Sequence, residues 1–360
     1  LWLALMLGGA ADSPGDFIVE LSALFTLGLA LLALRGAPLT PAARGGMILA
    51  GAALALPLLQ LIPLPAAMAG ALSGRATLAN ELASIQATGL SHLSLAPTFT
   101  ERSLWALLPA IALFTAGLAL PPVWRQRLLT TVVAFALASV MLGLAQVAGG
   151  PKSPLRFYEF THASDAVGFF ANRNHFASLL YVALALGVSL LAVHWRRGSS
   201  RPLPGVLGAT VVVFCLVGLG LARSRMGLLL GMLAMLGAAA ILIGSASGSG
   251  RAARRWALIT TTVGALAVVQ ISLYGILNRL EADPLDDGRW TFFANTRALA
   301  AHYAPLGSGL GTFVFAYQSG QTPQQQESFY INHAHNDFLE LALEAGWPAI
   351  GWMVAFALWW

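Results

Sequence analysis

The stretch "VLGATVVVFCLVGLGLARSRMGLLLGMLAMLGAAAILIG", residues 206–244, decides the fold class of this protein. Apart from Arg223 and Arg225 near its middle, it carries no charged side chain. A helix rises about 1.5 Å per residue, so roughly 17 to 20 apolar residues cross the hydrocarbon core of a bilayer. Each half of the stretch, 206–222 and 226–244, is long enough to do so. The sequence therefore predicts two membrane-spanning helices joined by a tight turn at the arginines.

The rest of the chain repeats this pattern. Of its 360 residues, 57% are hydrophobic and only 10% are charged, whereas soluble proteins carry about 25% charged residues. The strands of a membrane barrel would give short alternating segments instead of long apolar runs. We therefore predict an all-α polytopic membrane protein with about ten transmembrane spans. The predicted spans are a stub at 1–9, followed by 17–34, 46–64, 103–120, 128–147, 175–194, 206–222, 226–244, 257–276 and a last span from about 338 to 360.

The loops between the spans fall into two sets that differ in charge. One set holds ten arginines and no Asp or Glu, in "RGAPLTPAARG", "PPVWRQR", "HWRRGSSRPLPG" and "GSASGSGRAARRW". Short cationic loops stay in the cytoplasm during insertion, so the longer loops 65–102, 148–174 and 277–337 are predicted to face outward. The net charge of +5 is thus a topology signal and does not indicate a nucleic-acid partner.

The sequence divides into two predicted regions. Residues 1–164 hold the N-terminal transmembrane helices with outer loop 65–102, and residues 165–360 form a core region that includes outer loop 277–337. This last loop mixes aromatic residues, Gly and Pro with polar residues, a composition that is not typical of disorder. We expect it to fold as a large, partly helical cap over the outer face. Because the chain starts and stops inside hydrophobic stretches, we expect both termini to be trimmed.

Four polar clusters lie at the predicted outer ends of spans. The first is "GFFANRNHFASLL", residues 168–180, in which Asn172, Arg173 and Asn174 precede a span. These residues are typical of a helix N-cap with an interface anchor. Asparagine side chains also orient sugar hydroxyls or phosphates, so both interpretations stay open.

The second cluster is the turn "LARSRMGLLL", residues 221–230. Snorkelling would account for one arginine at the end of a span. Two arginines in a turn this tight are more than anchoring requires. Arginine is always charged and presents a planar fork of donors that fits phosphate oxygens, which favours a functional role, best for Arg225.

The third cluster is "DPLDDGRWTFFANTRALAAHYAPLGSGLGTF", residues 283–313. Arg289 opens a segment of helical pattern. The "GSGLG" at 307–311 lacks the Gly-Lys-Ser/Thr of a phosphate loop and the strand context of a dinucleotide fingerprint. We therefore expect its glycines to permit a turn or close backbone packing. Asp286 and Asp287 either hold a cation or pair with Arg289.

The fourth cluster is "INHAHNDFLELALEAGW", residues 331–347. The Asp337 and Glu340 spacing resembles a capping box, so a helix is expected to begin at Asn336 or Asp337. His333 and His335 then lie just before a helix N-terminus, where a neutral imidazole can accept a proton from an attacking hydroxyl. The alternatives are a polar cap with satisfied hydrogen bonds, and a metal site of the two histidines with Asp337 that lacks an obvious third and fourth ligand.

All four clusters converge on the predicted outer face, whereas the spans are almost free of charge except for Glu20, Glu340 and Glu344 near outer ends. Transporters more often keep polar groups near the midplane on broken helices. The pattern therefore indicates an enzyme that works at the outer leaflet on an anionic, lipid-borne substrate. The alternative is a transporter or channel for an anionic or lipid-linked substrate, with the arginines as a collecting funnel.

The order and spacing of these motifs resemble the bacterial O-antigen ligase and O-antigen polymerase superfamily. The resemblance is clear over about 165–360 and weaker over 1–164, where "LQLIPLP" before an outer loop also looks like members of the group. It implies a metal-independent membrane glycosyltransferase without a cofactor, in the bacterial inner membrane with its active site on the periplasmic face. The implied donor is a glycan on undecaprenyl pyrophosphate, and the implied acceptor is lipid A–core of lipopolysaccharide or a growing surface polysaccharide.

The resemblance also implies roles for single residues. Arg225 matches the arginine after the paired spans, Arg289 the arginine of the large loop, and His335 the histidine before Asn-x-x-Leu. Met226 departs from the Ser-Arg-Gly that is frequent in the family, because it separates Arg225 from Gly227. We expect these three matching residues to be catalytic, with His335 as the base and the arginines on the pyrophosphate. The residues expected to bind substrate are Arg223, Asn172, Arg173, Asn174, His333 and Asn336.

Overall fold

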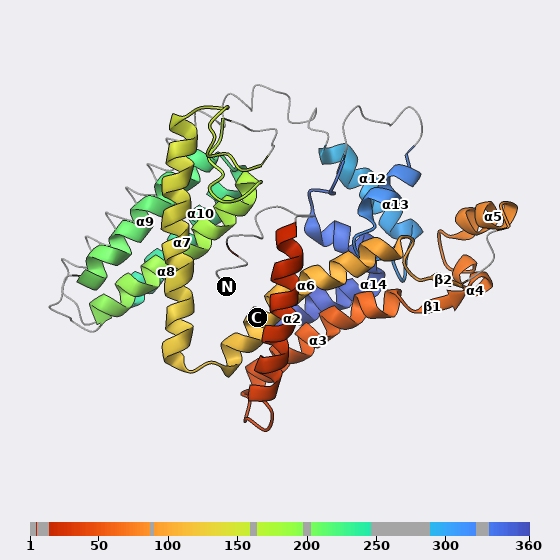
Figure 1. Ribbon diagram of the computed structural model, residues 1–360, viewed down its shortest axis with the longest axis horizontal. Helices are drawn as coiled ribbons and strands as arrows, with labels where there is room; N and C mark the ends of the chain where they lie inside the picture. The colour runs from red at the N-terminus through yellow and green to blue at the C-terminus, as the bar shows by residue number, and fades with distance from the viewer. Residues whose placement is uncertain are drawn as a thin grey trace. The chain divides into compact units, whose positions relative to one another are not determined.

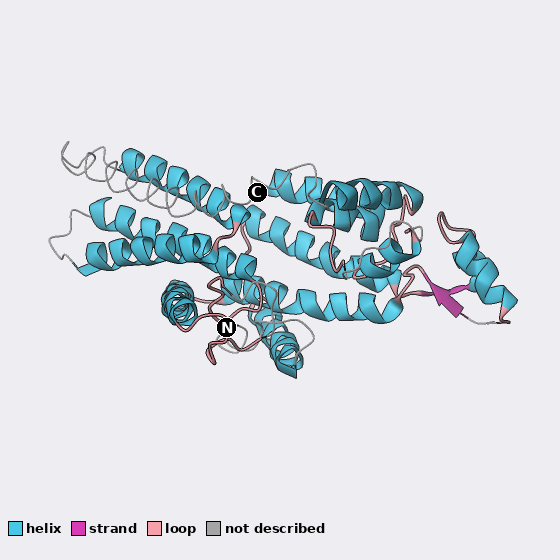
Figure 2. Cartoon of the chain, turned by 90° about the horizontal axis from the view of Figure 1, so that it is seen from above, coloured by secondary structure: helices cyan, strands magenta, loops and turns pink. Residues whose placement is uncertain are grey.

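The computed structural model describes residue 5 and residues 14–86, 90–158, 164–196, 203–245, 289–321 and 331–360. Helix dominates these residues, and one short two-stranded sheet is the strand structure that Figure 2 shows among them. The chain divides into two compact units that interleave along the sequence. Unit 1 contains residues 1–19 and 120–282, and unit 2 contains residues 20–119 and 283–360. The predicted division after residue 164 is a division of the sequence and stays a prediction.

The described part of unit 1 is a bundle of four long helices, of which the first crosses the other three at an angle in Figure 1. They are α7 (Pro122–Ala148), α8 (Arg173–Arg196), α9 (Leu203–Ala222) and α10 (Arg225–Ser245). Helix α8 packs against each of the other three. The buried core between them is apolar, with Val140, Phe176, Leu180, Cys215 and Leu219 among its members.

Small residues allow these helices to approach closely. A Cβ atom added at Gly227 of α10 would lie 2.5 Å from the Cβ of Ala177 on α8. The predicted tight turn is present, because α9 ends at Ala222 and α10 begins at Arg225. Arg223 closes the turn with a φ of 48°.

Unit 2 contains shorter elements around a second group of long helices. Helix α2 (Pro14–Ala33) starts in unit 1 and continues into unit 2 at Glu20. The remaining elements are α3 (Pro41–Gln60), β1 (Pro63–Pro65), α4 (Ala66–Gly70), α5 (Ala76–Ser84), β2 (Leu90–His92), α6 (Pro97–Ala119), α12 (Arg289–His302), α13 (Phe313–Ser319) and α14 (Asp337–Trp359). Helix α3 packs against α6 and α14, and α14 packs against α12 and α13. Strands β1 and β2 are antiparallel, with Leu64 opposite Ser91.

Helix α14 is broken at Gly346, where φ is 60°. In an unbroken helix the N–H of each residue bonds to the carbonyl four residues earlier. The N–H of Trp347 instead donates to the carbonyl of Pro305 at 2.8 Å, and Pro348 has no N–H to donate. The carbonyls of Leu343 and Glu344 are therefore released from the helix.

The "GSGLG" loop takes up the released carbonyls. Ser308 N–H donates to Leu343 at 3.0 Å, and Gly309 N–H donates to Glu344 at 2.8 Å. The buried amide of Gln60 adds a further bond, 2.9 Å from its Nε2 to the carbonyl of Glu344. A broken helix is tolerated at membrane depth when other groups satisfy its free backbone. The glycines thus serve close backbone packing, as the sequence predicts.

Side chains of three other segments secure the same loop. Gln60 also accepts from the N–H of Leu310 at 2.9 Å. Arg75, which is only 4% exposed, donates to the carbonyls of Gly307 and Leu93. The carboxylate of Glu344 accepts from the N–H of Phe313 at 2.8 Å, at the start of α13.

The structure confirms a mostly helical chain and contains, among its described residues, five helices that are long and apolar enough to cross a membrane. These are 15–33, 41–60, 97–119, 122–148 and 337–359. Shorter apolar helices run over 206–222 and 226–237. The predicted spans at 1–9, except residue 5, and at 257–276 lie outside the described residues, so the total of about ten stays a prediction.

Candidate functional site

A buried carboxylate surrounded by arginines lies at one end of the unit 1 bundle. Asp165 is 1% exposed, and its Oδ2 forms an ion pair with the guanidinium of Arg173. Its Oδ1 lies 3.7 Å from the guanidinium of Arg223. Arg156 donates to the backbone carbonyl of Asp165 at 2.9 Å. One negative charge therefore faces three positive charges among the described side chains, which leaves an excess of positive charge.

The two arginines that pair with Asp165, Arg173 and Arg223, differ in how far their side chains are exposed to solvent. The Arg173 side chain is 14% exposed, and a buried cation needs its partner carboxylate to offset the loss of hydration. The Arg223 side chain is 54% exposed and sits at the edge of the cluster. Arg223 is therefore the member whose charge solvent or a bound anion can reach.

Gln146 fixes the loop that carries Asp165. It lies fully buried on α7 and accepts from the N–H groups of Val167 and Gly168 at 3.2 and 3.0 Å. Its Nε2 donates to the carbonyls of Gly168 and Leu155 at 2.8 and 3.0 Å. A buried amide with four partners is a rigid anchor.

The asparagines of the first cluster have local hydrogen-bond partners. The Oδ1 of Asn172 accepts from the N–H of Asn174 at 2.8 Å, which is N-cap geometry for α8. The Oδ1 of Asn174 accepts from the hydroxyl of Ser224 at 2.8 Å. Because Ser224 also accepts from the N–H of Gly227 at 3.1 Å, it caps α10. Asn174 thus ties the start of α8 to the start of α10.

Arg225 is the first residue of α10. Helix N-termini favour anions, because their N–H groups point outward and the helix dipole is positive there. The side chain of Arg225 lies outside the described part. Its backbone position is nevertheless next to the Arg223 turn and to Ser224, so three predicted residues, Asn174, Arg223 and Arg225, lie around one turn.

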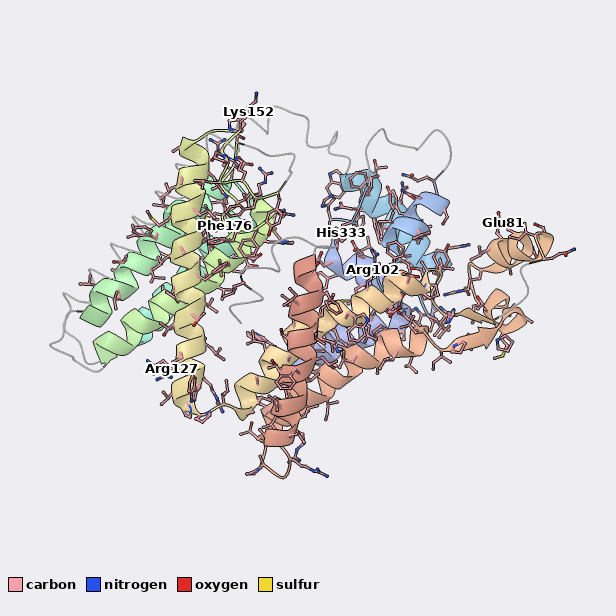
Figure 3. The ribbon with its side chains drawn as sticks, in the orientation of Figure 1. Glu81, Arg102, Arg127, Lys152, Phe176 and His333 are labelled. Atoms are coloured by element: carbon pink, nitrogen blue, oxygen red, sulfur yellow. The ribbon has the colours of Figure 1, made fainter. Side chains whose placement is uncertain are left out.

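In unit 2 a glutamate holds the residues that precede His335. Glu340 Oε1 lies 2.8 Å from the Nδ1 of His333, and Glu340 Oε2 accepts from the N–H of Ala334 at 2.8 Å. The hydrogen bond between Glu340 and the His333 ring is the main cause that raises the pKa of His333 above its ordinary value of 6.5. Figure 3 labels His333 beside α14. Helix α14 begins at Asp337, as predicted, but its cap is Asn336, which accepts from the N–H of Leu339 at 3.1 Å.

His335 itself has a φ of 54°, in the left-handed region that side-chain-bearing residues rarely adopt. Three non-glycine residues of the described part have a positive φ: Gln86, Arg223 and His335. Such strain is concentrated at functional sites. The His335 ring lies over Phe292 on α12, with 6.1 Å between the ring centroids. Arg289 is the first residue of α12, one helical turn before Phe292, and its side chain lies outside the described part.

The structure thus gathers the predicted residues into two groups. Unit 1 holds the group Asn172, Arg173, Asn174, Arg223 and Arg225, and unit 2 holds the group Arg289, His333, His335 and Asn336. Asp286 and Asp287 lie outside the described residues. Among the described side chains, no group of three or more His, Cys, Asp or Glu residues is arranged to hold a metal ion.

Sequence reasoning missed Asp165, Gln146 and the tasks of Glu340 and Glu344. A signal existed for Gln146, because an amide inside an apolar span needs internal partners. Glu340 and Glu344 stood out as carboxylates one turn apart at the end of a span. Asp165 had no local signal, since its partners lie on other segments.

Comparison of the sequence with models of known protein families gives a match over part of the chain. The family model described as O-antigen ligase matches residues 210–354. Residues 210–354 are therefore similar to the O-antigen ligase family. No curated protein and no solved structure matches the chain.

The O-antigen ligase match covers Arg223, Arg225, Arg289, His333 and His335. It confirms the resemblance and implies an enzyme of ligase or polymerase type, embedded in a membrane by several helices. It also implies lipid-linked glycan and acceptor substrates in general terms. Asp165 and the asparagines of the first cluster precede the matched range.

Proposed function

We propose that this protein transfers a glycan from undecaprenyl pyrophosphate to an acceptor hydroxyl at the periplasmic face of the bacterial inner membrane. The acceptor is lipid A–core or a growing surface polysaccharide. The observation that carries the proposal is the O-antigen ligase match over the range that contains Arg225, Arg289 and His335. The strained backbone of Arg223 and His335 supports it, because strain of this kind accompanies functional sites.

His335 acts as the general base in this proposal. As the acceptor oxygen forms its bond to the anomeric carbon, the hydroxyl proton passes to the imidazole of His335. The bond between that carbon and the pyrophosphate oxygen breaks, and undecaprenyl pyrophosphate leaves with the bonding electrons. A hydroxyl is a poor nucleophile at neutral pH, so a positioned base contributes about 10²–10⁴-fold to the rate.

The arginines stabilise the charge that develops on the leaving pyrophosphate. Fixed cations aimed at a developing charge act in a water-poor site without reorganisation. Arg225 and Arg289 take this role, and exposed Arg223 assists by binding phosphate. Arg173, paired with buried Asp165, contributes to the positive potential rather than by direct contact. Asn172, Asn174 and Asn336 are the residues that we propose for hydrogen bonds to the sugars. The reaction needs neither metal nor cofactor.

The proposed topology has about ten spans, with the arginine-rich short loops in the cytoplasm. Residues 65–102 and 277–337 then cover the periplasmic face. Membrane lipids surround the spans, and no nucleic acid takes part.

Substitution of the proposed catalytic residues tests the function. We expect His335→Ala and Arg289→Ala to abolish glycan transfer while each variant still inserts and folds. Transfer should also survive EDTA. Wild-type transfer by either variant would remove that residue from the mechanism, and loss of transfer in EDTA would revive the metal site.

A deletion strain identifies the acceptor. Short, uncapped lipopolysaccharide indicates a ligase, and one repeat unit on core indicates an O-antigen polymerase. Normal lipopolysaccharide with loss of exopolysaccharide indicates an exopolysaccharide enzyme. Flux of an anion through proteoliposomes that lack any polyprenyl glycan would instead support the transporter.

A further inference from the structure

The carboxylate of Glu340 occupies an unusual position at the start of α14. In a capping box, the acidic side chain at the third helical position reaches back to the N–H of the cap residue. Glu340 is one position further along the helix than that, because Asn336 is the cap. Its side chain passes the cap and binds the two residues before His335, with both oxygens engaged at 2.8 Å.

His335 is therefore fixed from both sides. On its N-terminal side, Ala334 is 2% exposed and bonds through its N–H to Glu340. On its C-terminal side, Asn336 is held by its cap bond to Leu339. A non-glycine residue in the left-handed region costs about 1–3 kcal/mol and persists only when its surroundings over-determine it. Glu340 supplies one of these constraints.

We propose that Glu340 is a positioning residue that sets the imidazole of His335 for catalysis through its bonds to His333 and Ala334. The inference rests on the proposed function, in which His335 is the base. Glu340 does not touch substrate in this role. His333 is the strut of this arrangement: its Nδ1 bonds to the Glu340 carboxylate and so connects that carboxylate to the backbone that precedes His335.

The carboxylates of α14 favour the protonated form of His333. Beyond Glu340 itself, Asp337 and Glu344 of α14 also favour the protonated imidazole. The pair is therefore either a charged imidazolium–carboxylate pair or a neutral imidazole that donates from Nδ1. The strut persists in both forms, because the Nδ1–H bond to the carboxylate is retained.

The first test neutralises the carboxylate. We expect Glu340→Gln to lower kcat by about 10- to 100-fold, the loss expected from a misplacement of about 1 Å, with little change in KM for the donor. The assay uses the full chain in lipid nanodiscs, lipid-linked oligosaccharide extracted from the producing cells as donor, and glycolipid from the same cells as acceptor. The matched control is Asp337→Asn, which removes an exposed charge three residues away in the same first turn and should leave kcat within about twofold, since its charge is exposed to solvent.

The second test uses two amides in place of His333. The amide nitrogen of Asn falls near the position of Nδ1, whereas that of Gln falls near Nε2. We expect His333→Asn to keep most of kcat through a retained bond to Glu340, and His333→Gln to lose about as much as Glu340→Gln. Because His333 is exposed, this pair decides the question even when Glu340→Gln fails to fold.

The outcomes separate this inference from the proposed function. Inactive His335→Ala with wild-type kcat in Glu340→Gln, or in His333→Gln, would overturn the positioning role and leave the base in place. Equal losses in His333→Asn and His333→Gln would show that the imidazole itself is needed and would also overturn it. Full activity in His335→Ala would overturn the proposed base and the inference together. The pKa of His333, measured by NMR, tests the bond to Glu340 without an activity assay: it should fall much further in Glu340→Gln than in Asp337→Asn, because the Glu340 bond is the largest cause of the raised pKa and Asp337 a smaller one.

Discussion

At the scale of single residues, the buried carboxylate of Asp165 is a charge that cannot be changed without consequence for its partners. Removing one partner of a buried ion pair leaves the other charge uncompensated, which costs about 3–5 kcal/mol. Replacing both partners by neutral groups costs much less, because no charge is left in the interior. Asp165 also lies 3.7 Å from the guanidinium of Arg223, so the electrostatics of the turn depend on the same carboxylate.

We predict that Asp165→Asn lowers the free energy of unfolding by about 3 kcal/mol or more, since Arg173 loses its partner. The double variant Asp165→Asn, Arg173→Gln should recover most of that loss. Thermal unfolding in detergent, followed by tryptophan fluorescence, measures both. Arg223→Gln is the control, and a partly exposed pair of this kind contributes at most about 1 kcal/mol. An equal loss in the single and double variants would contradict the prediction.

A second prediction concerns His333 and pH. Its bond to Glu340 raises the pKa of His333 in the native state above the ordinary 6.5, so the native state holds the proton more tightly than the unfolded state. The stabilisation is fully present below pH 6.5 and is lost as the pH rises through the higher native pKa. The Tm difference between wild type and His333→Gln should therefore shrink from acidic to alkaline pH. A difference that stays constant with pH would refute this.

At the scale of elements, the break in α14 determines how this helix packs against the loop at 307–311. Gly346 adopts a φ of 60°, and a Cβ atom there would lie 2.1 Å from the carbonyl oxygen of Pro305. Gly351 lies in the same helix with no atom within 4 Å of its virtual Cβ. The two glycines form a natural pair for comparison.

We predict that Gly346→Ala destabilises the protein by more than about 1–2 kcal/mol, because the left-handed conformation and the contact with Pro305 both oppose a side chain. Gly351→Ala should leave stability unchanged or raise it by up to about 1 kcal/mol, the helix-propensity difference. Thermal unfolding of the two variants side by side gives the answer. Similar Tm values for both would contradict the role assigned to the break.

The elements were largely predictable from the sequence, whereas the partnerships between them were not. Apolar runs of sufficient length predicted eight of the long helices among the described residues, and the arginines at 223 and 225 predicted the α9–α10 turn. Asn336 and Asp337 predicted the start of α14. Asp165 and Gln146 act on residues of distant segments, and the release of two carbonyls at Gly346 becomes visible only when the loop at 307–311 is seen to receive them. Local periodicity carries no record of such pairings.

At the scale of the whole molecule, the orientation in the membrane can be tested on one helix. Helix α7 has 27 residues, and residues Lys152 and Arg127 lie near its opposite ends in Figure 3. A helix of this length reaches about 40 Å, enough to cross a bilayer. The arginines near its start and the polar loop after its end assign those ends to opposite sides.

We predict that Lys152→Cys is labelled by a membrane-impermeant maleimide added to cells with a permeabilised outer membrane, whereas Gln126→Cys is labelled only after lysis. Both positions are exposed. The sole native cysteine, Cys215, is buried and is replaced by Ala in both variants. Labelling of Gln126→Cys in intact cells would reverse the orientation and place the arginine cluster in the cytoplasm.

The break at Gly346 also allows the two segments of α14 to tilt independently of each other. The segment before it takes its direction from the loop at 307–311, whereas the segment after it is tied to α3 through the indoles of Trp352 and Trp359, which donate to the carbonyls of Leu49 and Ala42. A bilayer of different thickness changes the tilt of spanning helices. A change in tilt of the segment after Gly346 would alter the angle at the break. The tilt of the segment between His335 and Gly346 would then hardly change. Catalysis would then tolerate changes in the acyl-chain length of the lipids, although the segment of α14 after Gly346 tilts in response to them.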